Sequence, residues 1–201
     1  DIDFLDILLP SIDRYVDFLF VDIEKKLNPV LGDIGQIQSN NFFHTSKNIL
    51  PDRTIYPFMP NDLTVQSVWN QVIQDVIRLK NSVIFILGFG NIGSKLALRL
   101  AESGCRVIVK SRTDNYKVYH TVEALNSIKH IGAIGEIGVT NSIEKGLLMS
   151  DIVILSAAAK NILDERYTDI LKSKERIVGV SRDNISQIDL RNLPNYLSVD
   201  V

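Results

Sequence analysis

Apolar runs of the kind found in buried strands alternate with amphipathic segments over the second part of the chain. Residues 82–87 (SVIFIL) form a β-branched and aromatic run without polar alternation, which is typical of a strand covered on both faces. Before it, apolar side chains recur at helical spacing and predict a helix over about 63–79. The pattern then predicts a helix over 91–103 and a strand over 106–109. These segments together predict a strand–helix–strand unit with parallel strands.

The same alternation continues to the end of the sequence. The predicted strands lie at 151–156, 176–180 and 196–201, with helical candidates at 142–149, 164–171 and 187–193 between them. The stretch before them is ambiguous, because Thr121 can cap a helix that runs through Ile128 and 137–140 can form a short strand. We therefore expect a doubly wound α/β domain of the Rossmann type, with parallel strands in the order 3-2-1-4-5-6 and helices on both faces.

Residues 1–60 lack this regularity. The stretch 36–48 is polar, and three prolines, Pro51, Pro57 and Pro60, interrupt the residues after it. We expect 1–60 to be part of a smaller, N-terminal substrate or catalytic lobe and 61–201 to be a nucleotide-binding domain. Because the sequence starts without Met and stops inside a predicted strand, we also expect it to be a fragment of a longer protein.

Composition narrows the class of protein. The 201 residues are 45% apolar and carry 22 basic and 24 acidic side chains, so the chain is neither disordered nor a disulfide scaffold and has no broad positive field for nucleic acid. No run approaches the ~18 apolar residues of a membrane span. Cys105, the single cysteine, cannot form an internal disulfide, and no metal-ligand spacing is present. We expect a soluble, cytoplasmic protein without a metal.

A glycine-rich motif is the most specific chemical signal. Gly88-Phe-Gly90-Asn91-Ile92-Gly93 fits the pattern G-x-G-x-x-G directly after the first predicted strand and at the start of a helix. In such a motif the first glycine allows the tight turn, the second lets a pyrophosphate approach the backbone, and the third allows close helix–strand packing. The motif predicts dinucleotide binding, and the alternative is a plain glycine turn without a ligand.

The residues after the second strand indicate which dinucleotide binds. An NAD site usually has a carboxylate there, which accepts hydrogen bonds from the ribose hydroxyls. Here the sequence is Lys110-Ser111-Arg112-Thr113, and no carboxylate occurs before Asp114. A guanidinium and two hydroxyls suit a 2′-phosphate, so we expect NADP in preference to NAD. The alternative is that Arg112 is an ordinary surface arginine.

The later segments carry a resemblance to a known family. The sequences 151–156 (DIVILS), 162–165 (ILDE) and 177–182 (IVGVSR) resemble the nucleotide-binding domain of D-isomer-specific 2-hydroxyacid dehydrogenases. The similarity extends over about 62–201. It implies an enzyme that transfers a hydride between a nicotinamide and the carbonyl or hydroxyl carbon of a small 2-keto or 2-hydroxy acid, a carboxylate substrate.

The resemblance also implies site residues. Arg182 matches the family's arginine that binds the substrate carboxylate, and Ser156, Ala157 and Ser181 fall on the loops that line the cofactor site. His44, in the first lobe, is a candidate acid/base residue, although a lone histidine is more often structural.

Two other classes of function stay open. One is a regulatory module that senses NADP(H) without turnover. The other is a reductase or dehydrogenase for an imine or amino acid, with Lys160 or His44 as a catalytic group. A homodimer contact through the helix that contains Trp69 and simple core packing explain the apolar stripe of that helix equally well.

Overall fold

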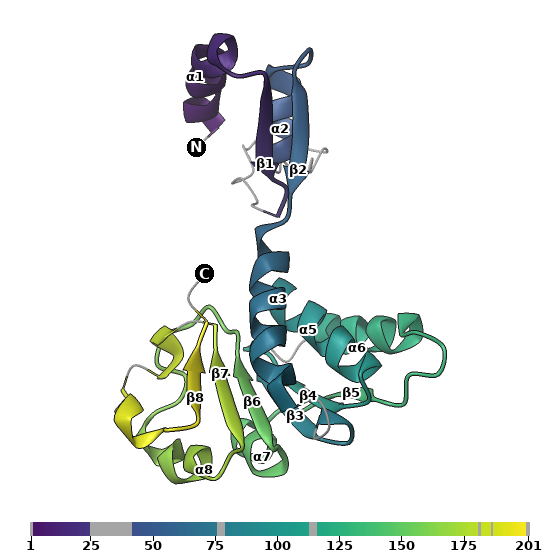
Figure 1. The fold of residues 1–201 in the computed structure, drawn as a ribbon, viewed down its shortest axis with the longest axis vertical. Helices are drawn as coiled ribbons and strands as arrows, with labels where there is room; N and C mark the ends of the chain where they lie inside the picture. The colour runs from purple at the N-terminus through teal and green to yellow at the C-terminus, as the bar shows by residue number, and fades with distance from the viewer. Residues whose placement is uncertain are drawn as a thin grey trace. The chain divides into compact units, whose positions relative to one another are not determined.

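The computed structural model describes residues 2–24, 42–75, 79–112, 116–180, 182–185 and 187–199. The chain divides into two compact units, Asp1–Asp62 (unit 1) and Leu63–Val201 (unit 2). Figure 1 shows the elements of each unit.

A parallel sheet forms the centre of unit 2 (Figure 1). Within the described residues it has six strands in the order β5-β4-β3-β6-β7-β8, and each neighbouring pair is parallel. This order confirms the predicted 3-2-1-4-5-6 arrangement. The strands are β3 (Val83–Leu87), β4 (Arg106–Lys110), β5 (Glu136–Val139), β6 (Ile152–Leu155), β7 (Arg176–Gly179) and β8 (Tyr196–Ser198).

Helices and short 3-10 turns cover both faces of this sheet. The helices are α3 (Pro60–Val72), α5 (Asn91–Glu102), α6 (Tyr116–Ile128), α7 (Ile143–Met149) and α8 (Thr168–Lys172). The 3-10 turns are η2 (Ile73–Asp75), η3 (Glu165–Tyr167), η4 (Arg182–Ile185) and η5 (Leu190–Asn192).

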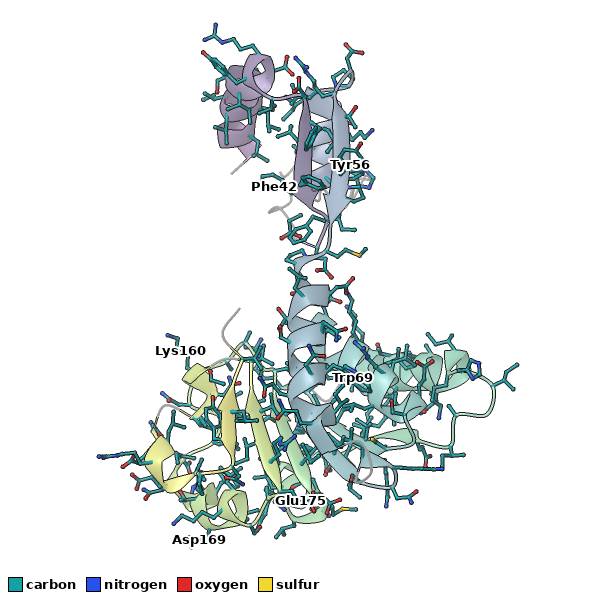
Figure 2. All side chains as sticks on the ribbon, viewed as in Figure 1. Phe42, Tyr56, Trp69, Lys160, Asp169 and Glu175 are labelled. Atoms are coloured by element: carbon teal, nitrogen blue, oxygen red, sulfur yellow. The ribbon has the colours of Figure 1, made fainter. Side chains whose placement is uncertain are left out.

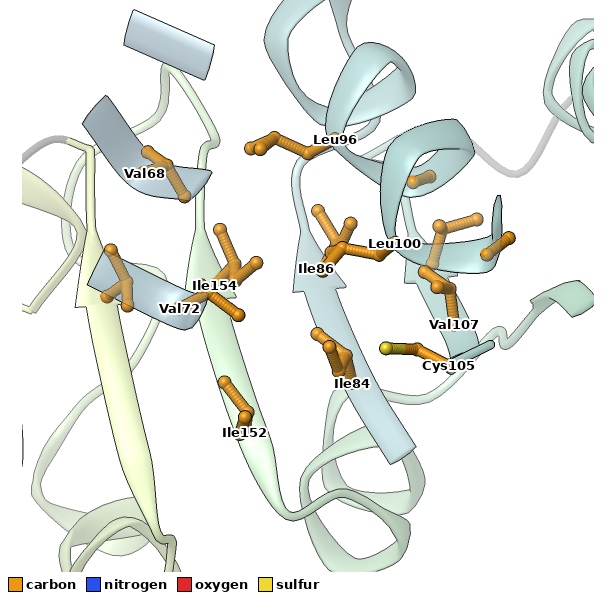
Figure 3. Packing of buried hydrophobic residues seen from close by; sticks show 14 of the residues in the cluster. Val68, Val72, Ile84, Ile86, Leu96, Leu100, Cys105, Val107, Ile152 and Ile154 are labelled. Carbon is orange, nitrogen blue, oxygen red and sulfur yellow. The ribbon is translucent and has the colours of Figure 1, made fainter. Parts of the chain in front are cut away.

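Alternate side chains of β3, β4, β6 and β7 enter two separate cores. Ile84 and Ile86 of β3 pack in a cluster with residues of α3, α5 and α6, part of which is drawn in Figure 3. Phe85 and Leu87, the alternate residues of the same strand, pack on the opposite face of the sheet with residues of α7 and α8. All four side chains are at most 4% exposed, so the unbroken apolar run reflects burial on both faces of the strand.

Three helix predictions differ from the structure in their limits. The helix predicted over 63–79 begins earlier, at Pro60, because proline fits the first helical turn. The helix α3 ends at Val72 and the 3-10 turn η2 follows it, while residues 76–78 of the prediction lie outside the described residues. Thr121 does not cap α6; it lies inside the helix and its hydroxyl donates to the carbonyl of Lys117. The predicted helix over 187–193 is only the 3-10 turn η5, which Pro194 follows.

Unit 1 contains a two-stranded parallel sheet with helices. Its elements are α1 (Ile2–Ile12), η1 (Asp13–Tyr15), β1 (Phe18–Asp22), α2 (Phe42–Ile49) and β2 (Thr54–Phe58). A small apolar core gathers Val21 and Ile55 from the strands with Leu5 and Leu9 from α1. Phe18, Phe20 and Tyr56 are exposed and pack on one another. Across the described residues of both units, no helix is long and apolar enough to cross a membrane.

Candidate dinucleotide site

The motif Gly88–Gly93 forms the turn between β3 and α5. Gly88 has a φ of +108°, a conformation that favours glycine. A Cβ on Gly88 would lie 2.6 Å from the Cα of Ala157, and a Cβ on Gly93 would overlap the carbonyl oxygen of Gly88. The turn, the start of α5 and the loop after β6 therefore pack backbone against backbone, and any side chain at Gly88 or Gly93 would separate them.

Gly90 lies in a different environment. It precedes α5 with an extended backbone (φ −93°), and no side chain caps the helix there. A Cβ on Gly90 would have no heavy atom within 4 Å, so the space beside it is open. The backbone N–H groups of a helical first turn carry a positive partial charge and suit a phosphate. An exposed glycine before a 12-residue helix thus fits the diphosphate of a dinucleotide.

The two strands that flank β3 hold the turn in place. The N–H of Gly88 donates to the carbonyl of Lys110 at the end of β4, at 2.9 Å. On the other side, the hydroxyl of Ser156 after β6 donates to the carbonyl of Gly88, at 2.8 Å. Strand order reverses between these neighbours, and open α/β sheets bind ligands in the crevice at such a reversal.

Residues predicted to select the cofactor follow β4 directly. Ser111 is half-buried and Arg112 is exposed. The ammonium group of Lys110 donates to the carbonyl of Ser111 at 2.8 Å. The bond from Gly88 to Lys110 places this strand end beside the glycine turn. Thr113 lies outside the described residues.

The other predicted site residues lie in several places. The backbone of Ala157 contacts the turn at Gly88, whereas Ser181 and the side chain of Arg182 lie outside the described parts of the chain. The backbone of Arg182 begins η4, directly after β7. Lys160 is exposed on the loop after β6, at the opposite end of unit 2 from Glu175 (Figure 2).

His44 belongs to unit 1. It is exposed on α2, and its ring meets that of Phe43 edge-on with centroids 5.8 Å apart. Its role as an acid/base residue stays a prediction.

Asn184 is a residue that sequence reasoning did not select. It is completely buried in η4, and its side-chain amide donates to the carbonyls of Ala157, at 2.8 Å, and Ala159, at 2.5 Å. Only the surrounding fold marks it, because a single asparagine in a polar stretch carries no motif.

Cys105 is not a candidate nucleophile. It is completely buried directly before β4, where its thiol donates to the carbonyl of Leu79 at 3.2 Å. Burial raises the pKa of this thiol to about 11, so it stays protonated at neutral pH. Within the described residues, no three His, Cys, Asp or Glu side chains are grouped so that they could hold a metal ion.

Comparison with the solved structure of a dipicolinate synthase chain supports the α/β fold. The A chain of dipicolinate synthase from Bacillus subtilis aligns with 92% of this chain and 70% of its own, at 14% identity and a TM-score of 0.54. A pyruvate reductase of Chlamydomonas reinhardtii aligns with 79% of this chain and 49% of its own, at 17% identity and a TM-score of 0.47.

A D-isomer specific 2-hydroxyacid dehydrogenase from Lactobacillus delbrueckii ssp. bulgaricus, in its NAD-complexed form, aligns with 71% of this chain and 48% of its own. Identity is 15% and the TM-score is 0.43. The chain thus spans about half the length of these two dehydrogenase and reductase structures. Among curated protein sequences, none matches it.

A family model matches more than half of the chain. Residues 59–193 match the NAD binding domain of the D-isomer specific 2-hydroxyacid dehydrogenases. The match contains the sheet strands β3 to β7, together with the glycine turn and the loops that follow β4, β6 and β7. The chain therefore belongs to the D-isomer specific 2-hydroxyacid dehydrogenase family through its NAD-binding domain.

Proposed function

We propose that this chain is the cofactor-binding part of an NADP(H)-dependent oxidoreductase that acts on a small 2-keto or 2-hydroxy acid. The observation that carries the proposal is the glycine turn. Gly88 and Gly93 are packed too closely for a side chain, whereas the space beside Gly90 is open, at the start of a helix. This combination supports a diphosphate that rests on bare main chain.

The preference for NADP(H) rests on the end of β4. Arg112 is exposed two residues beyond this strand, and Ser111 lies between them. A guanidinium can bind a 2′-phosphate through two parallel hydrogen bonds, and a hydroxyl can add a third. The sequence offers no carboxylate for a ribose hydroxyl until Asp114.

The proposed reaction divides the chemistry between cofactor and chain. When bound, the dinucleotide supplies or accepts the hydride at its nicotinamide ring. Arg182 would bind the substrate carboxylate and so orient the carbon that gains or loses the hydride. His44, from the lobe at 1–60, would exchange a proton with the substrate oxygen.

Titration of the protein with NADPH and NADH tests the cofactor assignment. We expect NADPH to bind more tightly, and Arg112→Ala to weaken NADPH binding by about 10- to 100-fold while leaving NADH binding unchanged. Arg106→Ala is the matched control, because Arg106 is an exposed arginine at the other end of β4. Equal affinities of the wild-type chain for the two dinucleotides would refute the role of Arg112.

A substrate panel separates the classes of function. Oxidation of NADPH with 2-keto acids alone supports the proposal, and oxidation that requires ammonia indicates an imine or amino-acid enzyme. Binding of NADPH without turnover of any substrate indicates a sensory module. Because the chain spans about half the length of the pyruvate reductase and the D-isomer specific dehydrogenase, this panel uses the full-length protein.

Assembly and location belong to the same proposal. We propose that the protein is cytoplasmic, since a protein with one cysteine needs no oxidising compartment. We also propose that it forms a homodimer. Light scattering of the purified protein measures the oligomeric state, and a monomer at micromolar concentration would contradict the dimer.

A further inference from the structure

A single buried residue, Asn184, gathers the backbone of the loop that follows β6. Its side-chain Nδ2 donates to the carbonyls of Ala157 and Ala159. Its own main-chain carbonyl accepts from the N–H groups of Ile162, at 3.0 Å, and Leu163, at 3.1 Å. Four main-chain groups of the segment 157–163 are therefore held by one residue of η4.

The side chain at this position needs two donors. An amide nitrogen supplies two N–H groups, which match two carbonyl oxygens, and a carboxylate or an aliphatic side chain supplies none. The Oδ1 of Asn184 is buried without a hydrogen-bond partner among the described residues. Burial of an unpaired acceptor costs free energy. The hydrogen bonds that join this side chain to the described residues therefore come from its two donors.

The segment held by Asn184 is the one that contacts the glycine turn. Ser156 precedes it and bonds to the carbonyl of Gly88, and the backbone of Ala157 lies against Gly88. A second connection runs along the chain, because Arg182 begins the same 3-10 turn two residues before Asn184. Asn184 thus connects the loop after β6, and through it the turn, to the segment that carries Arg182.

We propose that Asn184 is a positioning residue, which fixes the segment 157–163 against the glycine turn and so sets the geometry of the dinucleotide site beside that turn. The assignment to a dinucleotide rests on the proposed function, whereas the loop connection itself is independent of any ligand. A displacement of about 1 Å in such a segment is enough to impair binding and reaction strongly.

Asn195 provides a matched control within the same chain. Its Nδ2 donates to the carbonyls of Leu171, at 3.1 Å, and Lys174, at 2.6 Å, and its main-chain carbonyl accepts from Ile177. Its Oδ1 is also buried without a partner among the described residues. Asn195 precedes β8, however, at the amino edge of the sheet, whereas Asn184 follows β7 at the carboxyl edge. The side-chain amides of the two residues are bonded alike, each to two carbonyls, but the residues lie at opposite edges of the sheet.

The experiment compares Asn184→Ala with Asn195→Ala by three measurements on the full chain. We expect both variants to lose stability in urea, but only Asn184→Ala to raise the Kd for NADPH, by about tenfold or more. We also expect amide hydrogen exchange at Ile162 and Leu163 to accelerate at least about tenfold in Asn184→Ala alone. Asn184→Ser keeps one donor, so its Kd for NADPH and its exchange rates should lie between those of wild type and Asn184→Ala. If Asn184→Ala fails to fold, Asn184→Ser takes its place in the comparison.

The outcomes distinguish failure of this inference from failure of the proposed function. If Asn184→Ala and Asn195→Ala change the Kd equally, or if exchange at Ile162 and Leu163 is unaltered, Asn184 is not a positioning residue. If the wild-type chain binds neither NADPH nor NADH, the proposed function fails. In that case the exchange measurement still decides whether Asn184 fixes the loop, because it needs no ligand.

Discussion

The hydroxyl of Ser156 donates a 2.8 Å hydrogen bond to the carbonyl of Gly88, which joins the end of β6 to the turn after β3. With the bond from Gly88 to Lys110, the turn is held from both neighbouring strands. Backbone contacts and one side chain thus hold Gly88 at its φ of +108°.

Removal of this hydroxyl should loosen the turn. We expect Ser156→Ala to reduce the free energy of unfolding by about 1 kcal/mol and to weaken NADPH binding by about fivefold, because Gly88 loses one of its two anchors. Urea unfolding and a binding titration measure the two effects. Ser150→Ala is the control, since Ser150 is a buried serine before the same strand whose hydroxyl bonds to Leu147. Unchanged NADPH affinity in Ser156→Ala would contradict the role of the bond.

The second and third glycines of the motif should respond differently to alanine. Gly90→Ala should leave stability within about 0.5 kcal/mol of wild type, because its Cβ meets no protein atom. It should nevertheless weaken NADPH binding by about tenfold or more, since the methyl group would occupy the space of the diphosphate. Gly93→Ala should cost about 1–3 kcal/mol or more in stability, because its Cβ would overlap the Gly88 carbonyl. Urea unfolding measures the stability of both variants, and titration measures their NADPH binding. A Gly90→Ala variant that is destabilised but still binds NADPH as wild type does would contradict the prediction that Gly90 contacts the ligand and not the protein.

The buried thiol predicts a pH dependence of stability. Burial raises the pKa of Cys105 from its ordinary value of 9.0 to about 11, so the folded state holds this proton more tightly than the unfolded state. The resulting contribution, at most roughly 3 kcal/mol, is complete below pH 9 and is lost as the pH rises towards 11. Between about pH 8 and 11, the free energy of unfolding measured in urea should fall more steeply in wild type than in Cys105→Ala.

The same burial predicts slow reaction of Cys105 with thiol reagents. At about pH 8 the native chain should react only when it unfolds, whereas the chain in urea should react at once. Rapid labelling of the native protein would show that the thiol is accessible, in conflict with its complete burial.

Arg176 connects the start of β7 with the end of α3. Its guanidinium donates to the carbonyl of Gln71 at 2.6 Å, in the last turn of that helix, where carbonyls lack helical partners. We expect Arg176→Ala to lower the free energy of unfolding by about 1–3 kcal/mol without a change in NADPH affinity, because β7 begins at the edge away from the glycine turn. Urea unfolding and a titration measure these two quantities. A loss of NADPH affinity equal to that of Arg112→Ala would contradict this assignment.

Most of unit 2 could be predicted from its sequence for a physical reason. Strands buried on both faces need unbroken apolar runs, and Ile84–Leu87 and Ile152–Leu155 are such runs. The glycine motif follows from steric requirements at Gly88 and Gly93 that no other residue meets. Helix limits were less predictable, because Thr121 has the chemistry of a cap and yet bonds within α6 to Lys117.

Unit 1 and the loop contacts could not be predicted in this way. The strands of unit 1 leave Phe18 and Phe20 exposed, and Pro57 lies inside β2, so neither strand has the pattern of a buried one. Asn184 depends on contacts with Ala157 and Ala159, which lie 27 and 25 residues away in the sequence. Such contacts exist only once the sheet has formed.

The central claim is that a dinucleotide diphosphate contacts the main chain at Gly90–Gly93. The most direct measurement is an amide NMR titration of the ¹⁵N-labelled chain with NADPH. We predict that the amide resonances of Gly90, Asn91 and Ile92 shift most and saturate with a single Kd. Saturable binding that leaves these three resonances unmoved, or no binding at all, would contradict the account.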